Sequence, residues 1–148
     1  MFDENYLKAE DTINQARCRL QKLLDNSSTK GLENREAYKE IETLLEHLED
    51  AEKSLEYLSK PTKEGRLIEA EGGKYYIAYD DGTESYNLSC GNNVEVYLQE
   101  DLEEEVEEGW HIGRVEHKSK NGQEGYYFYG ANKPFLYQGM RARKRIER

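Results

Sequence analysis

The chain has 148 residues, of which 36% are hydrophobic and 35% are charged, so any hydrophobic core must be small. Its formal net charge of -10 opposes binding to a nucleic-acid backbone and favours basic partners. No stretch approaches the roughly 20 apolar residues that a membrane-spanning helix needs, so we expect no membrane association. Two scattered cysteines, Cys18 and Cys90, and an N-terminus without a basic and then apolar segment predict a cytoplasmic protein.

Two segments between residues 2 and 59 carry apolar residues at alternating spacings of four and three, which is the heptad pattern of paired helices. The first seam is Phe2, Tyr6, Ala9, Ile13, Ala16, Leu20 and Leu23, and the second is Ala37, Ile41, Leu44, Leu48, Ala51, Leu55 and Leu58. Between them, residues 25–34 are rich in turn formers. Asn34 is expected to cap the second helix and Pro61 to end it. The sequence therefore predicts an antiparallel, coiled-coil-like helical hairpin over residues 1–60.

Further apolar residues flank the two seams and widen the apolar face of the hairpin: Leu7, Leu24, Tyr38, Leu45 and Tyr57. These side chains need a cover, which can be the C-terminal domain, a second copy of the hairpin or a partner protein. A homodimer formed through the hairpin is one expectation. The alternative is that these residues are only contacts at the edge of each seam.

After a polar linker, residues 65–148 change to the short alternating runs that are typical of strands. The expected strands lie at 65–70, 75–79, 94–98, 110–117, 126–129 and 140–146. Asn121–Gly122 between two apolar-rich runs is a strong signal for a β-hairpin. Short strands at close spacing favour a small closed barrel, so the predicted class is α+β, with a helical hairpin followed by a β-barrel domain at residues 65–148.

Five segments of the second half carry a resemblance to known proteins: Gly65–Ile68, Gly91–Tyr97, Trp110–His117, Gly125–Phe128 and Leu136–Arg143. Their order resembles that of a family of small bacterial domains of unknown function, and more generally that of SH3-like barrels. Such domains are similar to ones carried by phages and mobile elements. The family has no assigned catalytic residues, so the resemblance implies a fold but no active site.

An acidic run follows the predicted strand at 94–98 and holds the candidate partner-binding residues. Its acids are Glu100, Asp101, Glu103, Glu104, Glu105, Glu107 and Glu108. Leu102 and Val106 are four residues apart, so the run forms either one helical turn or the tip of a long hairpin. Spaced carboxylates can occupy the place of phosphates on a basic surface, because Arg and Lys bind both groups. The plainer alternative is a solvated, disordered loop.

A basic strand near the C-terminus offers the opposite charge. Arg141, Arg143 and Arg145 alternate with Lys144, and surface tyrosines such as Tyr127 and Tyr129 lie on the preceding strand. Arginines that hold phosphates and rings that stack on bases would make a nucleic-acid site. The alternative is that these arginines pair internally with the acidic run.

We find no sequence motif for a metallopeptidase, a phosphate-binding loop or a dinucleotide-binding turn, so no enzymatic activity, cofactor or metal is expected. The favoured hypothesis is a non-enzymatic acidic protein that docks on a basic, nucleic-acid-handling bacterial protein. An inhibitor from a mobile element or phage, of the anti-CRISPR kind, would fit this description. The alternatives are a nucleic-acid-binding SH3-like module that uses the basic strand and a dimeric scaffold protein.

Overall fold

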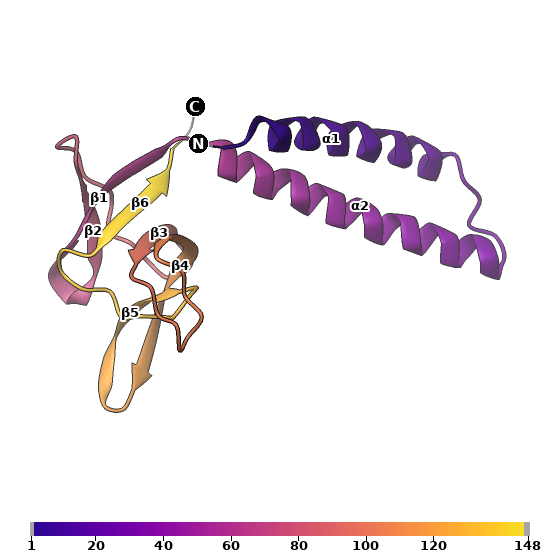
Figure 1. Cartoon of the computed structure of the whole chain (residues 1–148). Helices are drawn as coiled ribbons and strands as arrows, with labels where there is room; N and C mark the ends of the chain where they lie inside the picture. The colour runs from indigo at the N-terminus through magenta and orange to yellow at the C-terminus, as the bar shows by residue number, and fades with distance from the viewer. Residues whose placement is uncertain (1, 147–148) are drawn as a thin grey trace. The chain divides into compact units, whose positions relative to one another are not determined.

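The computed structural model describes residues 2–146. It divides into two compact units, residues 1–60 and residues 61–148, and each is described by itself. The first unit holds α1 (Glu4–Asp25) and α2 (Leu32–Ser59), which run antiparallel as a helical hairpin (Figure 1). As far as residue 146, the second unit holds six strands and one short 3-10 turn, so the α+β class is confirmed.

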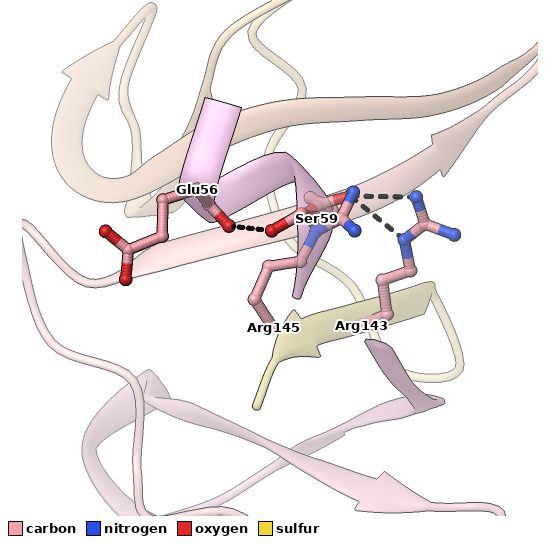
Figure 2. Close-up of polar contacts among 5 residues, drawn as sticks. Glu56, Ser59, Arg143 and Arg145 are labelled. Carbon is pink, nitrogen blue, oxygen red and sulfur yellow. Dashed lines mark hydrogen bonds and ion pairs between the residues drawn. The ribbon is translucent and has the colours of Figure 1, made fainter. Parts of the chain in front are cut away.

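The boundaries of the helices follow from local sequence. The Asp3 carboxylate accepts a hydrogen bond from the Asn5 amide at 2.8 Å and caps α1. α2 ends at Ser59, whose hydroxyl donates to the Glu56 carbonyl oxygen at 2.7 Å (Figure 2). The chain is extended at Lys60, as a following proline requires.

The expected cap at Asn34 is wrong. Gly31 occupies the N-cap position of α2 and has a positive φ of 88°. Asn34 lies inside the first turn, where its side-chain amide donates to the Lys30 carbonyl oxygen at 2.9 Å. Glycine adopts a positive φ without steric cost, so Gly31 can hold the backbone conformation that the start of α2 requires. The N-cap preference of asparagine therefore does not decide where this helix begins.

The seam between the helices differs from the predicted one by a single position at two points. Leu24 and Leu45 are buried, whereas Leu23 is 66% exposed and Leu44 is 43% exposed. Each pair offers two adjacent leucines, so the heptad pattern alone does not decide which one faces the partner helix. A straight helix also drifts by about 20° per heptad, which moves its buried stripe to the next residue.

The six strands of the second unit form one antiparallel sheet in the order β2-β1-β6-β3-β4-β5. Their bounds are β1 (Thr62–Glu69), β2 (Tyr75–Tyr79), β3 (Asn93–Leu98), β4 (Gly109–Lys120), β5 (Gln123–Tyr129) and β6 (Arg141–Arg145). β4 and β5 form a hairpin that extends from the rest of the unit (Figure 1). Its turn is Asn121–Gly122, both with positive φ (52° and 78°), so this predicted hairpin is confirmed.

The core of this unit lies on the inner face of the sheet. Its fully buried members include Leu67, Ile77, Val96, Val115 and Phe128, each 0% exposed. The Phe128 ring occupies the space where Gly113 has no side chain, because a Cβ there would lie 2.5 Å from the ring. Gly113 is therefore required by the packing of β4 against β5.

The expected closure into a barrel is wrong, because β2 and β5 stand at opposite ends of the strand order. Loop segments occupy both outer edges instead. The Ser85 amide donates to the Ile77 carbonyl oxygen at 2.9 Å, and the Phe128 amide donates to the Pro134 carbonyl oxygen at 2.9 Å. These hydrogen bonds pair backbone N–H and C=O groups at the outer edges of β2 and β5. The two edge strands therefore do not have to pair with each other to close the sheet.

Candidate binding surfaces

The acidic loop, residues 99–108, connects β3 to β4 as the tip of a hairpin and is not a helical turn. Asp101 and Val106 exchange two backbone hydrogen bonds of 2.9 and 2.8 Å. The Asp101 carboxylate also accepts from the amides of Glu103 and Glu104, each at 3.2 Å. Val106 is 6% exposed and belongs to the core. The loop therefore has a defined turn with an apolar anchor.

Asp101 is engaged in this turn and is half-buried, so it differs from the other predicted acids. The remaining acids are exposed: Glu100, Glu103, Glu104, Glu105, Glu107 and Glu108. Within residues 2–146 none of these six carboxylates forms an ion pair. Leu102 stands among them with 80% of its surface exposed. The loop thus presents unpaired negative charge beside one apolar side chain.

The arginines of β6 pair internally, but their partner is not the acidic loop. Glu95 of β3 lies opposite Arg143 in the sheet and is 1% exposed. Arg143 Nε donates to Glu95 Oε1 at 3.0 Å, and Arg145 Nε donates to Oε2 at 2.7 Å (Figure 2). A second Arg145 nitrogen donates to Oε1 at 3.1 Å. These charge-assisted bonds compensate the burial of the carboxylate.

The other two basic residues of the strand, Arg141 and Lys144, do not add to a shared cationic surface. The Arg141 guanidinium lies 4.4 Å from the centroid of the Tyr97 ring and 5.2 Å from that of Trp110, and it reaches Glu64 at 3.8 Å. Lys144 falls on the other face of β6 by the alternation of the strand. The four basic residues therefore do not form one free cationic stripe.

Tyr127 and Tyr129 do not join the β6 arginines, because β3 and β4 stand between β5 and β6. They meet a different set of cations on the outer face of the β4–β5 hairpin. We call this set the aromatic–basic patch, and its members are Arg114, Lys118, Tyr127, Tyr129, Lys133 and Phe135. The predicted nucleic-acid set is therefore split between two places.

Three cations of the patch lie against aromatic rings. Arg114 and Lys133 are 4.3 and 4.8 Å from the Tyr129 ring centroid, and Lys118 is 4.3 Å from that of Tyr127. The sequence prediction of the site missed these three cations, although the hairpin turn carries a signal for them. The Asn121–Gly122 turn sets the register of the hairpin, which pairs Arg114 with Tyr129 and places Tyr127 opposite Glu116.

A polar turn after β2 holds a carboxylate with a shifted pKa. Hydrogen bonds from the Thr83 hydroxyl and amide and from Lys63 lower the pKa of Asp81 to about 2. Lys63 Nζ lies 3.0 Å from Asp81 Oδ2 and 4.5 Å from the Tyr79 ring centroid. The Asp81 carboxylate therefore stabilises the conformation of this turn.

Neither helix within residues 2–146 has the length and hydrophobicity of a membrane-spanning segment. No group of three or more His, Cys, Asp or Glu side chains in the same range is arranged to hold a metal ion.

Comparison with known proteins identifies a family for the second half of the chain. A family model described as "Domain of unknown function (DUF5348)" matches residues 65–144. No curated protein and no solved structure matches the chain. The matched range agrees with the five segments that carry the sequence resemblance, and it contains both the acidic loop and the aromatic–basic patch.

Proposed function

We propose a binding function for this chain, which belongs to the DUF5348 family of domains of unknown function through residues 65–144. In this proposal it is a non-enzymatic acidic protein whose acidic loop docks on a basic partner protein. The observation that supports it is the set of six exposed, unpaired carboxylates on a turn with fixed backbone geometry. The anchor at Val106 holds that turn to the core.

Two physical effects favour such a contact. A loop that is already ordered loses little conformational entropy on binding, so more of its interaction energy appears as affinity. Arg and Lys side chains that bind phosphates also bind carboxylates, because both anions accept their hydrogen bonds. Leu102 would add an apolar contact at the centre of the charged surface, where it is now 80% exposed.

The finer proposal is that the partner is a bacterial nucleic-acid-handling protein and that docking inhibits it, as an anti-defence protein of the anti-CRISPR kind would. Its support is the net charge of -10 and the resemblance to domains of mobile elements. A cytoplasmic location belongs to the same proposal.

The test is a pull-down with the tagged full-length protein from a bacterial lysate, at low and high salt, with and without nuclease. The loop variant carries Glu103→Lys, Glu104→Lys, Glu105→Lys and Glu107→Lys. A control with the same change in net charge carries Glu33→Lys, Glu40→Lys, Glu42→Lys and Glu46→Lys at exposed positions of α2.

We expect one dominant basic protein that survives nuclease, is released by high salt and is lost from the loop variant alone. Equal loss from both variants would show that only total charge matters. Recovery that disappears with nuclease would place a nucleic acid between the two proteins. Either result contradicts docking through the acidic loop.

A second proposal concerns the helical hairpin, in which several large apolar side chains remain exposed. Tyr6 is 55% exposed, Leu23 66% and Leu32 60%. A second copy of the hairpin would cover such residues by making a four-helix bundle, and the protein would then be a dimeric scaffold. Light scattering at high micromolar concentration should give the mass of a dimer, and a monomeric mass contradicts this proposal.

A further inference from the structure

We propose that the aromatic–basic patch on the β4–β5 hairpin is a binding site for single-stranded nucleic acid. This site is separate from the acidic loop and does not depend on the function proposed for it. It also differs from the site predicted on the β6 arginines, because Arg143 and Arg145 are engaged with Glu95. Arg141 is engaged with Tyr97, Trp110 and Glu64.

The first argument is a local excess of positive charge in an acidic protein. The β4–β5 hairpin and the segment after it place Arg114, Lys118 and Lys133 on this face, and the described residues of the hairpin add one carboxylate there, Glu116, which lies 3.5 Å from Arg114. All three cations also lie against aromatic rings. An approaching phosphate would relieve their mutual repulsion. Exposed charges farther away than about 8 Å are largely screened at physiological salt, so the net charge of the chain does not cancel this local field.

The second argument is that the cations are positioned before a ligand arrives. Lys118 Nζ donates to the Lys133 carbonyl oxygen at 2.8 Å and lies 4.7 Å from the Phe135 ring centroid. Phe135 is held at the edge of β5 by a bridge to Tyr127. The segment that carries Lys133 is thus fastened to the hairpin at two points. Less side-chain freedom is then lost when a phosphate binds.

The third argument is the spacing of the rings, which selects a nucleic acid over another polyanion. Tyr127 and Tyr129 project from the same face of β5, with ring centroids 6.3 Å apart. Tyr129 is 40% exposed. The two ring planes are inclined at 67° and cations lie over both rings. Such neighbouring rings offer stacking surfaces to successive unpaired bases, while the nucleic-acid backbone follows the cations. A duplex hides the faces of its bases, so a single strand is the expected ligand.

The test is fluorescence anisotropy of a labelled oligothymidylate of about 12 nucleotides, titrated with the full-length protein at several salt concentrations. Tyr127→Leu together with Tyr129→Leu should weaken binding about 10-fold or more. Tyr86→Leu, at a tyrosine that is 96% exposed and outside the patch, should leave it unchanged.

A second pair of variants separates the patch from total charge. Arg114→Gln with Lys133→Gln should weaken binding and make the plot of log affinity against log salt shallower by about 1.4, out of a slope of about -2 for three phosphates. Lys30→Gln with Lys39→Gln removes the same charge from the helical hairpin and should change neither quantity. Circular dichroism confirms that each variant is folded.

Three results would overturn the proposal. The first is no saturable binding of the oligonucleotide by the unmodified protein. The second is an equal loss of affinity in the patch variants and in their controls. The third is an equally tight complex with polyglutamate or with a duplex of the same length, because either would mean that the rings do not stack on bases.

Discussion

Glu95 is a charged residue inside a β-strand and is only 1% exposed, so its two arginine partners decide whether β3 and β6 can pair. Glu95→Gln removes the negative charge and leaves Arg143 and Arg145 facing a neutral group in a poorly solvated place. We expect a loss of about 3 kcal/mol in the free energy of unfolding, since breaking one side of a buried ion pair costs this much. Urea denaturation followed by circular dichroism measures it.

The control for this prediction is Glu116→Gln. Glu116 pairs with Arg114 at 3.5 Å, and the side chains are 32% and 48% exposed. Solvent screens such a pair, so the change should stay within about 1 kcal/mol. Similar losses in the two variants would contradict the view that burial makes the Glu95 pairs important.

Asp81 provides a pH-dependent contribution to stability. Its pKa is lowered to about 2 by Thr83 and Lys63, below the ordinary value of an aspartate. A group with a lowered folded-state pKa stabilises the protein above its unfolded pKa, and this contribution is lost as the pH falls through the folded value. We therefore expect unmodified protein to lose stability between about pH 4 and pH 2 more steeply than Asp81→Asn. Denaturant melts at stepped pH test this, and parallel curves would contradict it.

Residue-scale partners were the hardest feature to predict. The sequence identified the arginines of β6 and the tyrosines of β5 as notable, but not which charges meet them. Glu95 and Arg143 are 48 positions apart and meet because β3 pairs with β6. Pairing between distant strands depends on the whole sheet, so no local spacing predicts it.

At the scale of elements, the acidic loop offers a clean comparison between two apolar residues. Val106 is 6% exposed and Leu102 is 80% exposed, although they are four positions apart. Val106→Ala should cost about 2 kcal/mol in the free energy of unfolding, from lost burial and a residual cavity. Leu102→Ala should leave stability unchanged and reduce affinity for the proposed partner. Thermal melts measure the change in stability, and the salt-dependent pull-down measures the change in affinity. A larger loss of stability in Leu102→Ala than in Val106→Ala would contradict the role of Val106 as an anchor.

Two elements defined by local chemistry were predicted correctly, the end of the second helix before Pro61 and the Asn121–Gly122 hairpin, because each depends on residues that are neighbours in sequence. The cap at Asn34 was predicted wrongly, because Gly31 takes the N-cap position. Closure of the sheet into a barrel was predicted wrongly, because it depends on whether loop segments form hydrogen bonds with the edge strands. The 83–85 and 134–136 segments cover the edges of β2 and β5 with backbone hydrogen bonds, and nothing in their composition signals this.

At the scale of the whole molecule, the two units differ in how much core each contains. Among the residues that the structure describes, the buried cluster has twelve members, from Leu67 to Ala142, and belongs entirely to the second unit. The described helices contribute only Leu24 and Leu45 as buried residues. We expect a fragment of residues 61–148 to unfold cooperatively on heating, whereas residues 1–60 alone should be weakly helical at low concentration and gain helix on association. Circular dichroism of both fragments over a range of concentrations tests this. A fully helical, concentration-independent 1–60 fragment would contradict it.

The pairing of β1 with β6 has a consequence for how this domain can be rearranged. Thr62 lies opposite Arg145, and the Ile146 amide donates to the Pro61 carbonyl oxygen at 2.9 Å, so the strands that enter and leave the domain are neighbours. A domain with adjacent ends can be inserted as a cassette into a surface loop of another protein without forcing that loop apart. It can also be circularly permuted, with a short linker joining residue 146 to residue 61 and new ends opened at the Asn121–Gly122 turn.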